Sequence, residues 1–383
     1  MKFFHLSDLH IGKQLNERSL IADQREILAQ VVEAAEREKP EVVVIAGDVY
    51  DRTVPSAEAV MLFDEFLTQL AGLPLAVLLI SGNHDSAERL DYGSSIFEKN
   101  NIYMVGTPPK QADEFIRKVT LSDENGPVHF YLLPFVKPGY LRRMVEEPEL
   151  CPESYDAAVR FLLEREQIDC AERNVLVSHQ FYTSGGTEPE RCESEMIRVG
   201  GLDNVDVSAL QAFDYVALGH IHGAQKVGQE WIRYAGTLLK YSVSEQKHHK
   251  HLLMVEMQKK GAPVLLTQIP LKPLHDVYEI TGSLAQILEQ AHEVNEDYVS
   301  IVLTDENELY RPKDNLLEWY PNLLNIRVRN SRTDRELEDY EETEHLTPQE
   351  AFAQFFEQMQ GRTLAEEEQQ LMNEIFEKVR GRE

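Results

Sequence analysis

Apolar segments of strand length alternate with helical patterns along residues 2–80, and this alternation limits the possible folds more than any other feature. Runs rich in Val, Ile and Leu predict strands, and the 3.6-residue apolar period between them predicts helices. Strands that alternate with helices imply a largely parallel sheet covered on both faces, with ligands at the carboxyl ends of the strands. The predicted strands are residues 2–6, 41–46, 75–80, 174–177 and 214–218, and the predicted helices are residues 20–39 and 56–71.

Polar residues of a few kinds follow each of these five strands. A single histidine after a strand is more often a structural residue than a ligand. Five strand ends that all carry carboxylate, imidazole or carboxamide groups are hard to attribute to chance. The residues are Asp8 and His10, Asp48, Asn83 with His84 and Asp85, His179, and finally His220 with His222.

The chemistry of these groups indicates a metal centre. Imidazoles with carboxylates suit Mn²⁺, Fe or Zn²⁺ better than Mg²⁺, which favours oxygen ligands. The set contains no thiolate, so a structural zinc site of the finger type is not expected. There are too many ligands for one ion, and two ions about 3.5–4 Å apart could clamp both oxygens of an in-line phosphoryl displacement. The sequence therefore predicts a two-metal site that acts on a phosphate ester.

Composition limits the partners and the compartment. The chain has 66 acidic and 38 basic residues, a net charge of −28. This charge argues against nonspecific electrostatic binding of nucleic acid over the whole surface. Any DNA contact should be local or assisted by a partner. Three cysteines without a CxxC pair fit a reducing compartment. No signal peptide is recognisable and the apolar runs are too short for a membrane span. We expect a soluble cytoplasmic protein that does not bind membranes.

Five motifs carry a resemblance to a known family. They occur in that family's order, and the resemblance is strong to about Gln246. The chain resembles the calcineurin-like metallophosphoesterase superfamily, and within it the nucleases of double-strand-break repair. The resemblance implies an α/β fold, a β-sandwich flanked by helices, with a small α/β capping domain and a C-terminal helical pair. The motifs are "HLSDLHIG", "IAGDVYDR", "SGNHDS", "LGHIHG" and "YAGTLLKYS" followed by "SEQ".

The resemblance also implies a role for each candidate residue. His84 would face the scissile phosphate and protonate the leaving oxygen, and Asp85 would orient His84. Asp48 would bridge two divalent metal ions, expected to be Mn²⁺. One ion would be held by Asp8, His10 and His222, and the other by Asn83, His179 and His220.

Three basic residues are candidate substrate contacts. Arg52 makes "GDVYDR" similar to an element with which protein phosphatases bind phosphate, but an ion pair of Arg52 with Asp51 or another neighbour is at least as good an interpretation. Distant nucleases have a histidine where this chain has Asp51, so that histidine's role does not transfer. Lys13 and Arg18, in the loop after His10, could contact the DNA backbone or be solvated loop residues. The basic run "QKHHKH" could contact DNA or be a solvated loop before a strand.

The sequence after residue 270 changes in character. We expect a nuclease domain at 1–270, a β-α-β-α-β capping domain at 271–333, an acidic linker at 334–345 and a helical tail at 346–383. The linker holds seven acids and one base within residues 334–344 and should be solvated. Two helices with capping boxes follow. Their apolar stripes, which the resemblance assigns to partner binding, contain Phe352, Phe355, Phe356 and Met359 in one helix and Leu371, Ile375 and Phe376 in the other.

The expected activity is two-metal hydrolysis of DNA. By resemblance, the chain would be an exonuclease on double-stranded ends and an endonuclease on single-stranded or hairpin DNA, in repair, recombination and replication. It would work with an SMC-like ATPase subunit, as a homodimer within a heterotetramer. A phosphomonoesterase or small-molecule phosphodiesterase with the same centre remains open. A catalytically silent scaffold is disfavoured because all seven ligand positions are filled.

Overall fold

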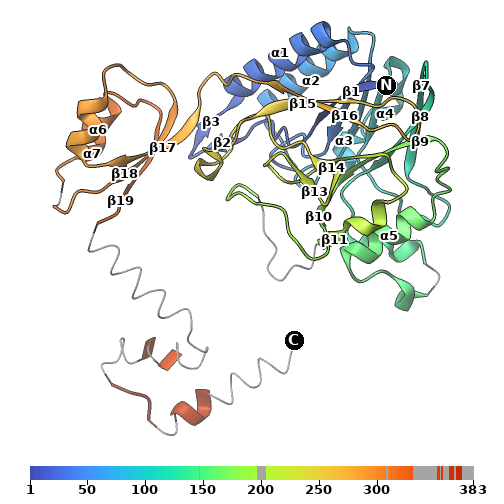
Figure 1. Cartoon of the computed structure of the whole chain (residues 1–383). Coiled ribbons are helices and arrows are strands. Elements are labelled where there is room, and N and C mark those ends of the chain that lie inside the picture. The colour runs from blue at the N-terminus through green and yellow to red at the C-terminus, as the bar shows by residue number, and fades with distance from the viewer. Residues whose placement is uncertain are drawn as a thin grey trace. The chain divides into compact units, whose positions relative to one another are not determined.

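The computed structural model describes residues 1–145, 147–195, 204–307 and 309–330, with short stretches of the C-terminal region at 352–353, 355–356, 362–365 and 368–372. The chain divides into two compact units (Figure 1). The first contains Met1–Tyr278 and Glu296–Tyr298, and the second contains Glu279–Asn295 and Val299–Glu383. None of the helices in the described ranges combines the length and apolarity needed to cross a membrane.

One six-stranded sheet of the first unit contains the chain's first strand. Strands β1, β4, β5 and β6 run parallel, whereas β15 is antiparallel to both β1 and β16. All five residues of β4 and of β5 are buried, as expected for parallel strands covered on both faces. The order across the sheet is β16 (Leu265–Pro270), β15 (His251–Glu256), β1 (Lys2–Leu6), β4 (Val42–Ala46), β5 (Ala76–Ile80) and β6 (Ile102–Val105).

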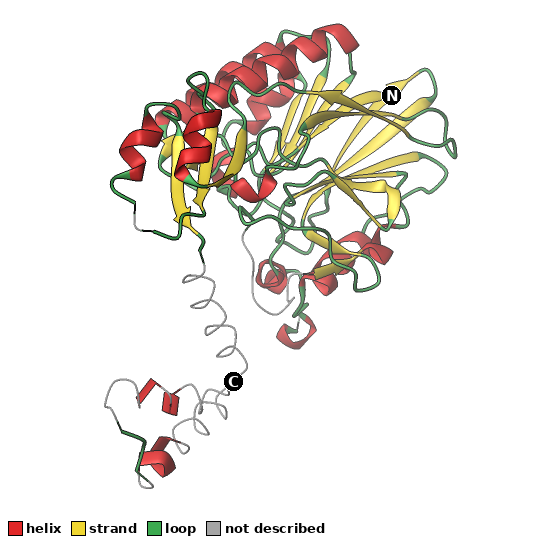
Figure 2. Cartoon of the chain, turned by 60° about the vertical axis from the view of Figure 1, so that its left-hand side comes forward, coloured by secondary structure: helices red, strands yellow, loops and turns green. Residues whose placement is uncertain are grey.

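A second six-stranded sheet packs against the first (Figure 2). Strands β8, β9, β12 and β14 are parallel, and an antiparallel strand lies at each edge. The order is β13 (Gln225–Val227), β14 (Gln229–Tyr234), β12 (Tyr215–Gly219), β9 (Arg173–His179), β8 (Gly126–Leu133) and β7 (Arg117–Asp123).

The core between the sheets is aromatic and aliphatic. The ring of Phe3 on β1 meets the ring of Phe130 at 5.7 Å between centroids and that of Tyr215 at 5.6 Å, both edge to face. Val42 and Val44 belong to the same buried cluster. Residues from both sheets thus form one apolar layer, which fixes the two sheets, and the loops at their edges, relative to each other.

Helices cover the outer faces of the sandwich. Helices α1 (Ile21–Glu38) and α2 (Ala57–Ala71) lie together beside the first sheet (Figure 1). The Ser56 hydroxyl caps α2 by accepting the Ala59 N–H. Helix α5 (Tyr155–Glu164) packs on the second sheet through a separate apolar cluster.

The first unit also contains shorter elements. The short helices are α3 (Ala87–Leu90) and α4 (Ser94–Phe97), and the short strand pairs are β2 (Gln14–Leu15) with β3 (Arg18–Ser19) and β10 (Phe181–Thr183) with β11 (Asn204–Asp206). The 3₁₀ turns are Glu98–Asn100, Pro138–Arg143, Pro148–Leu150, Val207–Leu210 and Val243–Glu245.

The predicted β-sandwich flanked by helices is confirmed. The five predicted strands correspond to β1, β4, β5, β9 and β12, and the two predicted helices to α1 and α2. The parallel sheet expected from the alternation along residues 2–80 is present as β1, β4 and β5, whereas β9 and β12 belong to the second sheet. Alternation along the chain is a local signal and does not specify which strands pair.

The second unit holds a three-stranded sheet in the order β17 (Val277–Gly282), β18 (Tyr298–Leu303) and β19 (Leu323–Val328), with α6 (Leu284–Gln290) and α7 (Pro312–Leu317) between the strands along the chain. The first residues of β17 and β18 are grouped with the first unit. This strand–helix order is the one expected from the sequence. Helix α6 begins with a capping box formed by Ser283 and Gln286.

The C-terminal predictions fall largely outside the described residues. The acidic linker is among the undescribed residues, as are Met359, Ile375 and Phe376. Phe352, Phe355 and Leu371 are exposed, and Phe356 is half-buried with the Arg362 guanidinium over its ring. The predicted role of these side chains in partner binding therefore stays a prediction.

Candidate metal centre

The polar residues that follow five strands meet at one edge of the sandwich. In-register pairing aligns the carboxyl ends of β1, β4 and β5 in one sheet and of β9 and β12 in the other. The two sheets are joined there by the His179 ring, whose Nδ1–H donates to the Ala46 carbonyl oxygen at 2.7 Å. The last residues of these strands and the loops that follow bring together Asp8, His10, Asp48, Asn83, His84, His179, His220 and His222.

Four of these residues have a strained backbone. Asp8, His10, Asp48 and His220 have φ values of 51°, 42°, 51° and 101°, which residues with a side chain rarely adopt. Neighbouring loops hold this strain: the Asp8 N–H donates to the Gly47 carbonyl and the His10 N–H to the Asp48 carbonyl, both at 3.0 Å. Such strain costs about 1–3 kcal/mol per residue and gathers at functional sites.

Asp8, His10 and His222 form the first candidate ligand set. Their ligand atoms all lie within 4.8 Å of one another, and all three residues are buried. His10 Nε2 is 3.2 Å from His222 Nε2 and 3.9 Å from Asp8 Oδ1. Among the described residues, His10 Nδ1 has no hydrogen-bond partner. The structure thus brings together the three residues that the sequence predicts for one ion.

Asn83, His179 and His220 form the second set. Asn83 Oδ1 lies 3.1 Å from His179 Nε2 and 2.8 Å from His220 Nδ1. Asp48 lies between the two sets, because its Oδ2 is 3.3 Å from His179 Nε2 and 3.7 Å from His10 Nε2. This is the position that a bridging carboxylate requires.

The hydrogen bond from His179 to Ala46 determines which ring nitrogen faces the centre. A backbone carbonyl only accepts, so His179 Nδ1 must carry a proton, and Nε2 is left pointing at the oxygens of Asp48 and Asn83. A lone pair facing two acceptor oxygens is unfavourable unless a proton or a cation lies between them.

The pKa values of the buried histidines and of Asp8 also indicate that the centre requires positive charge. Burial opposes a charge on His179, but the carboxylates of Asp48 and Asp8 and the hydrogen bond to Ala46 together raise the pKa of His179 to about 9. Burial lowers the pKa of His220 to about 3 and that of His10 well below its ordinary value. His10 and His220 are therefore neutral imidazoles, the form that binds metals. Burial raises the pKa of Asp8, which shows the cost of leaving that carboxylate without a compensating cation.

The donor set fits a dinuclear centre. It combines imidazole nitrogens, two carboxylates and one amide oxygen in a buried cluster, a mixture that suits Mn²⁺, Fe or Zn²⁺. Buried imidazole lone pairs and the buried carboxylates of Asp8 and Asp48 are unfavourable without nearby positive charge, and bound cations would supply that charge. A third group, His10 with Asp48 and His84, also lies within 4.8 Å, so His84 borders the centre closely.

Glycines precede three of the ligands and allow the loops to pack. A Cβ at Gly82 would overlap the Asp48 carboxylate, and a Cβ at Gly219 would lie 2.7 Å from His179 Nδ1 and overlap the Ala46 carbonyl oxygen. Side chains at these positions would therefore displace a ligand from a neighbouring strand. Gly82 and Gly219, which precede Asn83 and His220 in the motifs, are therefore needed for the loops to pack closely.

His84 lies at the half-buried rim of the centre. Its backbone N–H donates to Asp48 Oδ1 at 2.8 Å, and its ring Nδ1–H donates to the Asp51 carbonyl oxygen at 2.9 Å. Because Asp51 O only accepts, His84 Nε2 is the nitrogen left for a ligand or substrate.

The position of Asp85 differs from the expectation that it orients His84. Its carboxylate accepts the backbone N–H groups of Val49, Tyr50 and Gly82 at 2.9–3.1 Å. Burial raises the pKa of Asp85 to about 6. Asp85 thus ties the loop after β4 to the loop after β5, and the orientation of the His84 ring depends on the Asp51 carbonyl instead. The resemblance implied His84 as the partner of Asp85, but in this chain the Asp85 carboxylate turns back to backbone N–H groups.

The three candidate substrate contacts have different surroundings. Lys13 Nζ donates to Asp51 Oδ1 at 2.8 Å, and Arg52 Nε lies 3.7 Å from Asp51 Oδ2 while its side chain is 73% exposed. The Arg52–Asp51 ion pair, which the sequence left open, is thus present and solvent-accessible. Arg18 is half-buried in β3, outside the ligand cluster.

Several residues that hold the ligands were missed by sequence analysis. Gln24 on α1 donates through Nε2 to the carbonyls of Leu9 and His10, and its Oε1 accepts the Gly12 N–H. Ser194 contacts His222, and Glu245 contacts Ser194. Glu245 lies in the "SEQ" stretch that carries the resemblance, but neither it nor Ser194 follows a strand, so strand-end spacing gives no signal for them.

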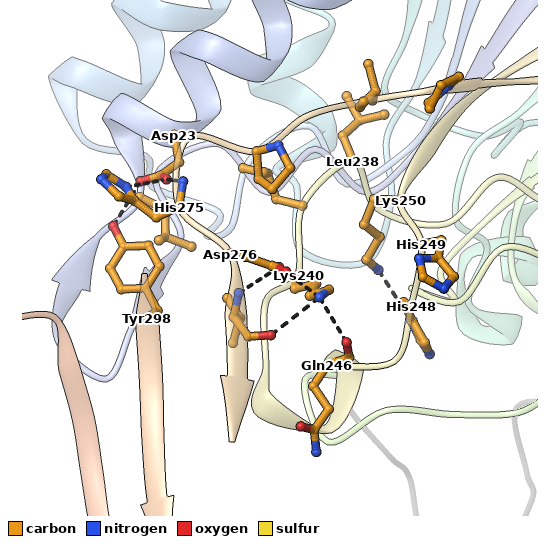
Figure 3. Close-up of a pocket in the computed structure, with 16 residues that line it drawn as sticks. Asp23, Leu238, Lys240, Gln246, His248, His249, Lys250, His275, Asp276 and Tyr298 are labelled. Carbon is orange, nitrogen blue, oxygen red and sulfur yellow. Dashed lines mark hydrogen bonds and ion pairs between the residues drawn. The ribbon is translucent and has the colours of Figure 1, made fainter. Parts of the chain in front are cut away.

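A pocket of about 340 Å³ lies in the first unit, separate from the ligand cluster (Figure 3). Asp23 accepts from His275 and Tyr298 on one side of it. Lys240 on the other side pairs with Asp276 at 2.8 Å. The basic run contributes His248, His249 and Lys250 to the lining, and Lys250 is engaged by Glu245 rather than solvated.

Comparisons with known proteins agree with this architecture. Residues 1–224 match the family model described as calcineurin-like phosphoesterase, and residues 273–360 match one described as type 5 capsule protein repressor C-terminal domain. Two curated relatives, from Staphylococcus epidermidis and Staphylococcus saprophyticus subsp. saprophyticus, are each named as the SbcD component of the nuclease SbcCD. Each is 34% identical over 330 residues, which cover 85% of this chain and 84% of the relative.

The chain is also similar, at lower sequence identity, to a solved structure. A dimetal phosphatase from Danio rerio is 14% identical, covers 70% of this chain and 96% of its own, and has a TM-score of 0.38.

The sandwich, with its ligand cluster at the edge where both sheets end, defines a calcineurin-like phosphoesterase, a metal-dependent hydrolase. Within that class, the extent of the sequence match identifies a narrower group. The chain belongs to the SbcD family of SbcCD nuclease components.

Proposed function

We propose that this protein is a two-metal DNA phosphodiesterase, an exonuclease on double-stranded ends and an endonuclease on single-stranded or hairpin DNA. The observation that carries the proposal is the pair of ligand sets joined at Asp48, with His84 at their rim. The relatives' name, nuclease, supports a nucleic-acid substrate.

The chain's own residues have distinct tasks in this function. Asp8, His10 and His222 would hold one divalent ion, and Asn83, His179 and His220 the other, with Asp48 between them. Two such ions, expected to be Mn²⁺, would activate water and neutralise charge on the phosphate. The groups that orient the ligands are the Ala46 carbonyl, which fixes His179, and the Asp51 carbonyl, which fixes His84.

His84 is the proposed acid. Its Nδ1–H is used by the Asp51 carbonyl, so only the doubly protonated imidazolium form carries a second proton, on Nε2, that can go to the leaving oxygen. The imidazole is only half-buried, which leaves room for a substrate to approach. A general acid at this position would speed the reaction by about 10²–10⁴. Asp85 supports the acid indirectly by fixing the loops on either side of it.

DNA binding would be local, because the chain's net charge of −28 repels a polyanion. Arg52 and Lys13 lie next to Asp51 beside the centre and are the proposed phosphate contacts, with Arg18 further away. Residues 271–333 are the proposed capping domain, which would select the shape of the DNA. The helical tail from residue 346, which follows the acidic linker, would bind an SMC-like, SbcC-type ATPase subunit, with two copies of each subunit in the complex.

One assay tests the proposal. The purified chain is incubated with Mn²⁺ or with chelator, and with duplex, hairpin or single-stranded DNA or a chromogenic phosphomonoester. We expect Mn²⁺-dependent cleavage of DNA and little activity on the monoester. Activity on the monoester without cleavage of any DNA would refute the proposal and favour the phosphomonoesterase that the sequence left open.

A further inference from the structure

The candidate ligand His222 is held by three residues that belong to neither ligand set. Its Nδ1 lies 2.8 Å from Ser194 Oγ. Its backbone N–H donates to Glu195 Oε1 at 2.7 Å, and its carbonyl oxygen accepts from Lys250 Nζ at 3.0 Å. Because Ser194 and Lys250 lie on different loops, His222 is fixed from two sides.

The direction of the Ser194 hydrogen bonds follows from its neighbour. Ser194 Oγ lies 2.7 Å from Glu245 Oε1, and a carboxylate can only accept, so the hydroxyl proton points to Glu245. The oxygen of Ser194 then accepts the Nδ1–H of His222. His222 Nε2 is left without a proton and faces His10 Nε2 at 3.2 Å.

Glu245 is a fixed anion rather than a surface acid. It is fully buried, with 0% of the residue exposed. Its Oε2 accepts from Lys250 Nζ at 2.6 Å, and its Oε1 accepts the Tyr241 N–H at 3.2 Å as well as the Ser194 hydroxyl. A buried carboxylate with this many donors keeps its charge and its orientation.

We propose that Glu245, acting through Ser194, is a positioning residue that holds His222 as the Nδ1–H tautomer and thereby sets the affinity of one of the two metal sites. The inference rests on the proposed two-metal function and assigns residues that the ligand motifs do not contain. A His222 ring in the other tautomer would present an N–H, not a lone pair, to the ion. Partners that orient a ligand imidazole in this way typically change metal affinity by about 10–100-fold.

The chain offers a matched control for the Ser194 hydroxyl. Ser244 Oγ accepts the Glu193 N–H at 3.1 Å and contacts Ser242 Oγ at 2.6 Å. It therefore joins the same two loops as the Ser194–Glu245 hydrogen bond without touching His222. Glu245 itself is a poorer target, because its removal would leave Lys250 buried without a counter-charge.

The test compares Ser194→Ala, Ser194→Thr and Ser244→Ala in the full chain. Mn²⁺ binding is measured by titration calorimetry, and the stability of the metal-free proteins by thermal unfolding. We expect Ser194→Ala to weaken one of the two sites by about 10–100-fold and to leave the other unchanged. Ser194→Thr, which keeps the hydroxyl, and Ser244→Ala should bind both ions like the wild type.

Two results would overturn the inference. One is an unchanged affinity for both ions in Ser194→Ala, including the case in which only the unfolding temperature falls. The other is equal loss in Ser244→Ala, which would mean that joining the loops is what matters. Failure of the wild-type protein to bind two ions is a separate result, because it would refute the two-metal function itself.

Discussion

The Nε2 atoms of His10 and His222 lie 3.2 Å apart although the residues are 212 positions apart in the sequence. His10 follows β1 in one sheet, and His222 follows β12 in the other. Asp48 Oδ2 lies 3.7 Å from His10 and 3.3 Å from His179, the last residue of β9. The centre is therefore built across the sandwich, and its geometry depends on the packing of the two sheets.

The first prediction concerns Asp48. Asp48→Asn should weaken Mn²⁺ binding at both sites, because one carboxylate serves both ligand sets and the substitution removes its charge. The loss at each site should exceed the ~10–100-fold typical of a group that only orients a ligand. Titration calorimetry measures both affinities. His222→Ala is the comparison, and it should weaken one site only. Two ions bound normally by Asp48→Asn would contradict the bridging assignment.

The second prediction separates the acid from the ligands. His84→Ala should lower the rate of DNA cleavage by ~10²–10⁴ while both ions remain bound, since His84 Nδ1 is used by the Asp51 carbonyl and its Nε2 is assigned to the leaving oxygen. Single-turnover cleavage measures the rate, and metal analysis of the same sample measures the number of bound ions. If His84→Ala lost an ion, His84 would be a ligand, as its proximity to His10 and Asp48 would allow.

The third prediction concerns a loop contact. Gly82→Ala should weaken metal binding and destabilise the fold by about 1–3 kcal/mol, as overpacking does, because the added Cβ would overlap the Asp48 carboxylate. Gly139→Ala is the matched control, since a Cβ there meets nothing within 4 Å and its φ is not positive. Urea unfolding and Mn²⁺ titration would be run on both. Equal behaviour of the two variants would argue against the role assigned to Gly82.

The ligands could be predicted from the sequence because each lies at the end of a buried strand or within a few residues after it. A run such as Val42–Ala46 identifies the strand, and the polar residue at its end, Asp48, is then a candidate ligand. The assignment of strands to two sheets was beyond the reach of this pattern. β9 pairs with β12 in the second sheet, and this sheet packs on the first through contacts remote in sequence, such as that of Phe3 with Tyr215.

The residues that orient the ligands were harder to predict. Ser194 and Glu245 lie in loops without a periodic pattern, and their partner His222 is 28 positions from Ser194. Asp85 was predicted to contact its neighbour His84, but its carboxylate turns back to three backbone N–H groups. Hydrogen bonds of this kind depend on the turn of the chain in three dimensions, which residue types alone do not specify.

The last prediction concerns the partner. Residues 334–383 hold fifteen acidic and five basic residues, so this region is unsuited to DNA, and its apolar side chains are the groups able to bind another protein. A chain that ends at Thr333 should keep its metals and its Mn²⁺-dependent cleavage of simple DNA but should no longer pull down the SMC-like ATPase subunit. Burial of each large side chain would contribute ~1.5–3 kcal/mol to the complex.

A point substitution tests this interaction in the full chain, where loss of the whole region is not a concern. Phe355→Glu should reduce binding of the ATPase subunit, because it places a charge in the apolar stripe. Phe115→Glu is the matched control: Phe115 is 58% exposed and Phe355 is 59% exposed, but Phe115 lies in the first unit, far along the chain from the tail. Binding is measured by pull-down and by titration with the purified subunit. Unchanged affinity in both the truncated chain and Phe355→Glu, or unfolding of the truncated chain, would mean that the tail is structural rather than a partner-binding element.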